Sequence, residues 1–376
     1  MVGQFALGFA VANPVILLSQ LQLRPLQATD ASHREYRPGD YLALRLVTTL
    51  LALAVIAALA VGSGYRRETA LVVILAGVAK GFESISDVLY GHLQQHEKMA
   101  TIARSMMLRG VLSVGVTTVA VWVTGSALWG AAALAGAWAL TLAAHDVPSV
   151  KAVGRIPTGL QWDWTAMRRL AKAALPLGVV TMLASLDTNI PRYVIAHDLG
   201  EAPLGVFAAV ASLQAAGSVL VNALGQTAAP RLARYHVAGD RMLFRSFLAK
   251  LLLIALVPGV AIIVVALAAG DAVPRVVFGP AFAHERTVFV WLSLSMAIWL
   301  VTSILGYGAT ASRRIQLQPY VLAAVAATTL VVSAFAVPRY GILGAAVGGT
   351  FSAALCCILY AALLLVPTAR VEAPSI

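Results

Sequence analysis

The sequence predicts an all-α polytopic membrane protein with about eleven transmembrane helices in two parallel-repeat bundles. Three observations predict this class: an apolar composition, apolar runs long enough to cross a bilayer, and short motifs that recur in the same order in both halves. Of the 376 residues, 60% are hydrophobic and 11% are charged, whereas soluble domains average about 25% charged residues. The mean hydropathy is +0.85. Water is therefore not the main solvent of this chain.

Eleven apolar runs approach the roughly 20 residues that a helix needs to cross a hydrocarbon core. In chain order they cover residues 3–22, 42–63, 69–90, 107–125, 127–145, 170–191, 203–224, 247–269, 287–309, 319–337 and 342–366. The runs are too long and too evenly apolar for strands that alternate in polarity, so helices are expected rather than a barrel. No long polar stretch separates them, which leaves no room for a soluble catalytic domain.

The distribution of the basic residues supports the number of predicted spans, because most of them lie in alternate loops between the spans. Twenty Lys and Arg residues lie at the ends that follow the first, third, fifth, seventh, ninth and eleventh runs. Six lie on the other side: Arg66, Arg67, Arg192, Arg275, Arg286 and Arg339. The positive-inside rule then predicts that the richer side and the C-terminus are cytoplasmic.

On this topology the first residue lies outside. Met1 nevertheless opens directly into an apolar run, without the basic residues that precede the apolar part of a signal peptide. We therefore expect a twelve-helix plan that lacks its first helix.

The charge balance and the cysteines exclude several other classes. A net charge of +11 would suggest a nucleic-acid partner in a soluble protein, but here it follows from the basic cytoplasmic loops, so no nucleic acid is expected. Cys356 and Cys357 are adjacent in an apolar run, which argues against a disulfide scaffold and a cysteine metal site. His92 and His96 have i, i+4 spacing but adjoin charged residues typical of a solvated loop. No metal site and no cofactor are predicted, and no nucleotide-hydrolysis or hydrolase motif is present.

Short motifs repeat between the two halves and set the expected domains. The matched sets are Gly39, Asp40 and Arg45 with Gly239, Asp240 and Arg245; Tyr90 and Gly91 with Tyr307 and Gly308; and Gly130–Ala132 with Gly344–Ala346. They pair the second span with the eighth, the third with the ninth and the fifth with the eleventh. We expect an N-terminal bundle at 1–145, a cytoplasmic linker at 146–168 and a C-terminal bundle at 169–376.

The third span carries three ionisable residues, Lys80, Glu83 and Asp87, on one helix face that Tyr90 and Gln94 continue. Charges inside a span are costly, which makes them functional candidates. A structural ion pair between Lys80 and Glu83 is the alternative. The matched positions of the ninth span are apolar: Ala297, Leu300 and Ile304. The scaffold therefore does not require these charges.

The sixth span is polar at its outer end, where it carries Asp187, Thr188, Asn189, Pro191 and Arg192. Because proline leaves a backbone carbonyl without its helical partner, this end is interpreted as lining a cavity. A kink at the interface, with Arg192 reaching outward to water, is the alternative.

The inner ends of the first and seventh spans are also polar. They carry Gln20, Gln22, Arg24 and Asp30 in one case and Asn222, Gln226 and Arg231 in the other. Arginine suits pyrophosphate because its planar fork donates two hydrogen bonds at once, so Arg24, Arg45, Arg231 and Arg245 are candidates for a cationic cavity mouth. The alternative is that they set topology and contact anionic lipid heads.

Three stretches carry a family resemblance: NPVILLSQLQLRPLQATD from Asn13, GFESISDVLYGHLQQHEKM from Gly81, and NIPRYVIAHDLGEAPLGVFAAVASL from Asn189 with VNALGQTAAPRLARY from Val221. The chain resembles, over essentially its whole length, the polysaccharide-biosynthesis flippases that export O-antigen and capsule precursors, members of the multidrug/oligosaccharidyl-lipid/polysaccharide exporter superfamily. The resemblance implies helix bundles around a central cavity and a location in the bacterial inner membrane. It also implies alternating access, driven in some relatives by an H⁺ or Na⁺ gradient.

The substrate that the resemblance implies is a polyprenyl-pyrophosphate-linked oligosaccharide. The expected partners are that substrate, membrane lipids, and a glycan polymerase or chain-length machinery. The predicted substrate-binding residues are Arg24, Arg45, Asn189, Arg192, Asn222, Gln226, Arg231 and Arg245. The predicted gating or ion-coupling residues are Asp30, Lys80, Glu83, Asp87 and Asp187.

Other functions remain open at this point. A cation-coupled multidrug antiporter of the same superfamily would share the two-bundle plan but favour acidic residues over arginine near the cavity. A membrane glycan polymerase or glycosyltransferase would need a sizeable outer loop, whereas the longest predicted one is 270–286. A structural partner of an assembly complex is the last alternative.

Overall fold

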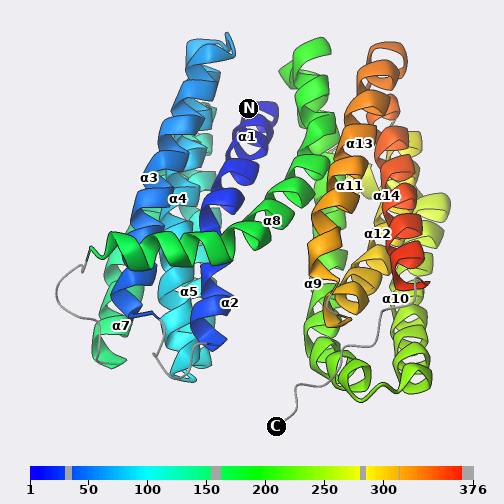
Figure 1. The fold of residues 1–376 in the computed structure, drawn as a ribbon. Coiled ribbons are helices and arrows are strands. Elements are labelled where there is room, and N and C mark those ends of the chain that lie inside the picture. Colours follow the sequence, from blue (N-terminus) through cyan, green and yellow to red (C-terminus); the bar gives the residue numbers. More distant parts are fainter. Residues whose placement is uncertain (30–35, 154–161, 280–284, 313, 366–376) are drawn as a thin grey trace. The chain divides into compact units, whose positions relative to one another are not determined.

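A computed structural model describes residues 1–29, 36–153, 162–279, 285–312 and 314–365 (Figure 1). The described residues are almost entirely helical and contain no β-strand. Contacts divide the chain into two compact units, Met1–Asn189 and Ile190–Ile376. The division falls within a helix, α8.

The first unit is built around α4. Its elements are α1 (Val2–Gln20), α2 (Leu23–Thr29), α3 (Pro38–Gly62), α4 (Arg67–Gln95), α5 (Met99–Thr124), α6 (Ala127–Thr141), the π-helical turn η1 (Leu142–Asp146), α7 (Val147–Val153) and the first part of α8 (Trp164–Asp198). α4 packs against α1, α2, α3 and α6. Gly77 and Gly81 allow α3 to approach closely, because a Cβ at Gly77 would lie 3.0 Å from the Ile56 side chain.

The first turns of α8 are amphipathic rather than uniformly apolar. Met167, Leu170 and Ala174 are buried in a cluster with residues of the α1–α2 turn, α3 and α4, whereas Arg168 and Lys172 are exposed. Further along, the Thr181 hydroxyl reaches the Leu17 carbonyl of α1 at 3.5 Å. α8 thus begins as a helix that covers the first unit.

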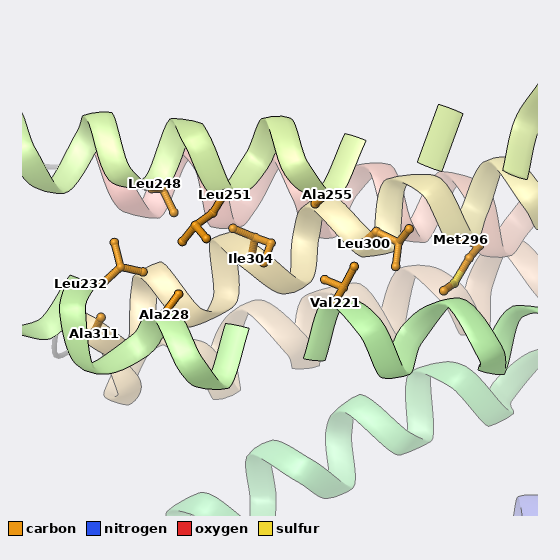
Figure 2. Close-up of a cluster of buried hydrophobic side chains, with 10 residues drawn as sticks. All are labelled: Val221, Ala228, Leu232, Leu248, Leu251, Ala255, Met296, Leu300, Ile304 and Ala311. Atoms are coloured by element: carbon orange, nitrogen blue, oxygen red, sulfur yellow. The ribbon is translucent and has the colours of Figure 1, made fainter. Parts of the chain in front are cut away.

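The second unit is built around α12 in the same way. Its elements are α9 (Glu201–Val237), α10 (Arg241–Ala269), α11 (Ala272–Phe278), α12 (Arg286–Ala311), the short 3₁₀ turn η3 (Ile315–Leu317), α13 (Gln318–Tyr340) and α14 (Ile342–Leu365), after the end of α8. Figure 2 shows a core in which Ile304 of α12 lies beside Leu251 of α10, and Leu300 of α12 lies near Val221 of α9.

The two units repeat one packing order. α4 packs on α1, α3 and α6, and α5 packs on α6; α12 packs on α9, α10 and α14, and α13 packs on α14. This is the pairing of spans that the repeated motifs predict. The all-helical fold is therefore confirmed, and helices of the first half correspond in their packing to helices of the second half.

Among the described residues, ten helices are long and apolar enough to cross a membrane. They contain ten of the predicted spans. The remaining one, 203–224, lies in α9, and side chains 214–220, 222 and 223 lie outside the described residues. The protein is a multi-pass membrane protein.

Candidate functional site

The polar face of α4 is occupied by charges that meet arginines from three other elements. Lys80, Glu83 and Asp87 recur at helical spacing and all three remain about one-fifth to one-quarter exposed. Their partners come from α2, α3 and α5. We call Arg24, Arg45, Lys80, Glu83, Asp87 and Arg109 the charged row.

Asp87 holds two arginines at one end of the row. Its Oδ1 lies 3.6 Å from Nη1 of Arg24, and its Oδ2 lies 3.4 Å from Nη2 of Arg45. Arg24 is held further by the Gln94 side-chain oxygen at 3.2 Å and lies over the Tyr90 ring, 5.6 Å from its centroid. The sequence-predicted residues Arg24, Arg45 and Asp87 are thus brought together.

The two arginines differ in access. The Arg45 side chain is 0% exposed, whereas that of Arg24 is 26% exposed. Arg45 also donates from Nη1 to Ser84 Oγ at 3.2 Å, and Thr49 lies on the same serine at 3.4 Å. In this conformation Arg45 positions Asp87, while Arg24 is the arginine that an incoming anion can reach.

Glu83 holds two cations at the other end of the row. It forms an ion pair with Lys80 on its own helix, and its Oε1 lies 3.3 Å from Nη2 of Arg109 in α5. Both cations lie near the Trp138 ring of α6, at 5.8 Å for Lys80 and 5.2 Å for Arg109. The indole of Trp138 is fixed by donating to Ser113 Oγ at 2.7 Å. The ion pair expected of a structural role is present, but it belongs to a larger cluster.

Arg109 is one of the twenty basic residues that the positive-inside rule places on the cytoplasmic side, and the sequence predicts no other role for it. The span is predicted at 107–125, whereas α5 begins at Met99, so Arg109 lies within the helix, beside Glu83. Spacing along α4 could not indicate which basic residue of a neighbouring helix would meet Glu83. An early helix start at Met99 was the available signal.

A second polar network was also missed. Asp146 is fully buried and accepts hydrogen bonds from Ser86 Oγ at 2.6 Å and from Ser105 Oγ. Tyr90 hydroxyl lies 2.7 Å from Ser105 Oγ. Asp146 is the first residue of the predicted linker, 146–168, where an acidic side chain is expected to face water. The sequence therefore does not indicate that it is buried.

The predicted residues near the middle of the chain lie close together along α8. Asn189 is buried and its side-chain amide donates to the Ser185 carbonyl of its own helix at 2.7 Å. Asp187 and Arg192 are partly exposed, and both take part in further interactions. The helix continues through Pro191 to Asp198 without a break.

The remaining candidates lie on exposed positions or outside the described residues. Gln226, Arg231 and Arg245 are exposed. Asp30 and the side chain of Asn222 lie outside the described residues. Arg245 differs from its sequence match Arg45 because α10 begins at Arg241 and α3 already at Pro38, so Arg45 lies further inside its helix.

No group of three or more His, Cys, Asp or Glu in the part of the chain that the structure describes is placed to hold a metal ion. Chemically, the first unit offers cations, carboxylates that already hold them, and an aromatic surface. Guanidinium groups held by carboxylates can pair with an anion by exchange, because phosphate and carboxylate oxygens accept from the same donors.

Comparisons with known proteins agree with this architecture. The family model described as "Polysaccharide biosynthesis protein" matches residues 2–236. The capsular polysaccharide biosynthesis protein CapF of Staphylococcus aureus is 22% identical over 359 residues, which cover 96% of this chain and 89% of CapF.

Two solved structures share the fold. One is the inward-facing conformation of a multidrug-resistance MATE transporter, with a TM-score of 0.68 at 14% identity. The match covers 96% of this chain and 88% of the transporter chain. The other is the lipid II flippase MurJ in an inward closed conformation, with a TM-score of 0.68 at 11% identity. The match covers 96% of this chain and 84% of the MurJ chain. The chain shares the fold of these two solved structures, and it belongs to the polysaccharide biosynthesis protein family.

Proposed function

We propose that this protein is a flippase that moves a polyprenyl-pyrophosphate-linked oligosaccharide from the inner to the outer leaflet of the bacterial inner membrane. It works by alternating access and serves the synthesis of O-antigen, capsule or exopolysaccharide. The family, the likeness to a capsule biosynthesis protein and the fold shared with a lipid II flippase support this function.

One observation carries the proposal: Asp87 is shared between a sealed arginine and an accessible one. A pyrophosphate that approaches Arg24 competes with Asp87 for the same donors, and a bidentate phosphate contact is stronger than the 3.6 Å pair it replaces. Binding thereby releases Asp87 from Arg24 and leaves Arg45 to hold it. Binding of an anionic substrate thus changes the ion pairs of a carboxylate of the protein, Asp87.

The remaining groups of the row serve the sugars and the coupling ion. The lipid tail stays in the bilayer while the polar sugars cross along the protein. Lys80, Glu83 and Asp87 gate the path or bind the coupling H⁺ or Na⁺. The C-terminus is cytoplasmic in this scheme, and a glycan polymerase or chain-length protein receives the product.

The test is complementation of a bacterium that lacks its own flippase, with surface glycan as the readout. We expect rescue by the wild-type chain and clear loss of export with Arg24→Lys, because lysine keeps the charge but loses the fork. Arg67→Lys is the matched control, since Arg67 is exposed at the far end of α4. Full export with Arg24→Lys would show that only the charge at this position matters.

A cation-coupled small-molecule antiporter is the second candidate. Its support is the fold shared with a MATE transporter together with the accessible carboxylates of Glu83 and Asp87. Drug-efflux assays in the same strains separate the two functions. Efflux of cationic dyes by the wild type, without restoration of surface glycan, would favour the antiporter.

A further inference from the structure

The network around Asp146 lies outside the charged row and has its own chemistry. Asp146 closes the π-helical turn η1, which interrupts the passage from α6 to α7. Single π-turns within α-helices occur often at functional sites, because they redirect one side chain. Here the redirected carboxylate is fully buried beside α4 and α5.

The two serine hydroxyls that contact the carboxylate both donate to it. Ser86 donates to Oδ2 at 2.6 Å, Ser105 donates to Oδ1, and Nδ1 of His145 lies 3.3 Å from Oδ1. Because the proton of Ser105 is directed to Asp146, the Tyr90 hydroxyl donates to Ser105 at 2.7 Å. This pattern is that of an ionised acceptor.

Within the described ranges, His145 is the basic side chain that lies within ion-pair distance of Asp146. Among the described residues, no lysine or arginine forms an ion pair with Asp146. On the neighbouring helix α5, Arg109 is paired with Glu83 and Arg104 is exposed, and Lys151 of α7 is exposed. A buried carboxylate without a counter-charge is costly, so the pair is stable when it carries one proton.

The pair joins an accessible group to the charged row. The His145 side chain is 24% exposed, whereas Asp146 is sealed. On the inner side, Ser105 and Tyr90 lead from Asp146 to the ring over which Arg24 lies. Arg24 in turn is held by Asp87.

We propose that His145 and Asp146 form a proton-exchange site that drives the transport cycle. The inference rests on the proposed flippase function and assigns the coupling proton to this pair, which leaves gating as the role of Lys80, Glu83 and Asp87. With a proton on the imidazole, the pair is neutral and the network is closed as described above. When the proton leaves, a buried negative charge remains, and the hydroxyls of Ser105 and Tyr90 reorient with Arg24. Histidine suits this step because its charge changes within the physiological pH range.

The chain offers a matched control. His197 and Asp198 form the same dipeptide pair at the end of α8, with Nδ1 and Oδ1 2.6 Å apart, but His197 is 89% exposed. Water balances the charge of this pair at every stage. His197→Gln and Asp198→Asn therefore test for effects of the substitution alone.

The transport test uses full-length protein in proteoliposomes with a fluorescent polyprenyl-pyrophosphate glycan in one leaflet. For one proton per substrate, a one-unit pH difference drives at most about a tenfold ratio between the leaflets. We expect the wild type to build up a ratio, and both His145→Gln and Asp146→Asn to equilibrate the leaflets without exceeding a ratio of one. The exposed-pair variants should match the wild type. A pH-driven ratio retained in both buried-pair variants, or a wild type that equilibrates without responding to pH, would overturn the inference.

A second measurement does not depend on transport. Imidazole nitrogen NMR of histidine-labelled protein should show one signal that is absent in His145→Gln and that changes between the protonated and the neutral form when the pH of the sample is changed. A His145 signal that keeps one protonation state at every pH at which the protein stays folded would overturn the proton site. A wild type that moves no glycan would contradict the flippase function, and the NMR titration would still decide whether the pair exchanges a proton.

Discussion

Arg45 is the most constrained charge of the charged row. Its side chain is sealed, Nη1 and Nη2 are engaged by Ser84 and Asp87, and Nε has no hydrogen-bond partner. Ser84 contributes no charge, so Asp87 is the group that neutralises Arg45. Removing that carboxylate leaves a cation buried without compensation, which is far costlier than losing an exposed pair.

Asp87→Asn should therefore lower the free energy of unfolding by about 3 kcal/mol, with some relief because Asp87 itself is partly exposed. The measurement is the Tm in detergent. Asp271→Asn, which removes an exposed pair with Arg286, should cost less than about 1 kcal/mol. The double variant Arg45→Met with Asp87→Asn should recover most of the loss, because no buried charge remains. No recovery would assign the effect to something other than the ion pair.

Glu83 is expected to matter for transport, whereas Asp87 is expected to matter for stability. It separates two cations that both lie near Trp138. We expect Glu83→Gln to keep normal membrane levels while surface glycan is lost, since a neutral amide leaves Lys80 and Arg109 unbalanced. Glu68→Gln, at the exposed start of α4, is the control on the same helix. Normal surface glycan with Glu83→Gln would return the residue to a purely structural role.

At the scale of elements, the packing of α9 on α12 depends on one glycine. A Cβ at Gly225 would lie 2.1 Å from the ring of Tyr307, far below any contact that side chains make. A Cβ at this position therefore requires the ring or one of the two helices to shift, and close packing opposes such a shift. Gly225 and Tyr307 thus set the spacing of the two helices.

Gly225→Ala should destabilise the protein by about 1–3 kcal/mol through overpacking, measured as a fall in Tm. Gly115→Ala is the control, because a Cβ there meets nothing within 4 Å. Tyr307→Ala should be the better partner for alanine at 225, so the double variant should be more stable than the sum of the single effects predicts. Strict additivity would show that the two sites do not interact.

α5 is exposed along most of its length. Ile102 and Ser105 are its buried residues, and Val111, Val114 and Trp122 are all more than two-thirds exposed. In a multi-pass membrane protein such an apolar surface faces lipid. Val114→Lys should place a charge in that lipid at a cost of about 2.5–3.5 kcal/mol and lower the amount in the membrane fraction, whereas Val114→Leu should not. Unchanged levels with lysine would place this face of α5 against another protein.

At the scale of the whole molecule, the sequence predicted the helices and their pairing but not the partners of the charges. Apolar length and repeated motifs are properties of single segments, so they can be recognised in the sequence without knowledge of how the helices pack. The meeting of Glu83 with Arg109, and of Asp146 with Ser86, joins residues on different helices. Arg245 shows the converse, since a matched motif placed it with Arg45 although its own helix begins later and leaves it exposed.

The two units share a packing order but differ in content. Where α4 carries Lys80, Glu83 and Asp87, α12 carries Ala297, Leu300 and Ile304, which are buried among apolar side chains. The core of the second unit around α12 therefore holds no charge at the three positions where α4 carries one. Rearrangement during transport is expected in the first unit, where ion pairs can exchange partners.

The distribution of charge on α4 also bears on how the protein is made. The most apolar 18 residues of α4 have a mean hydropathy of 1.5, which is half the value of 3.0 for the corresponding stretch of α10. Isolated charges in a span are costly for insertion. Arg45 leaves the ribosome before Asp87, but Arg109 follows Glu83 and reaches the translocon only with α5. α4 should therefore enter the bilayer as a hairpin with α3 and stay at the translocon until α5 arrives, which makes this stretch of synthesis the step most sensitive to the loss of any one arginine.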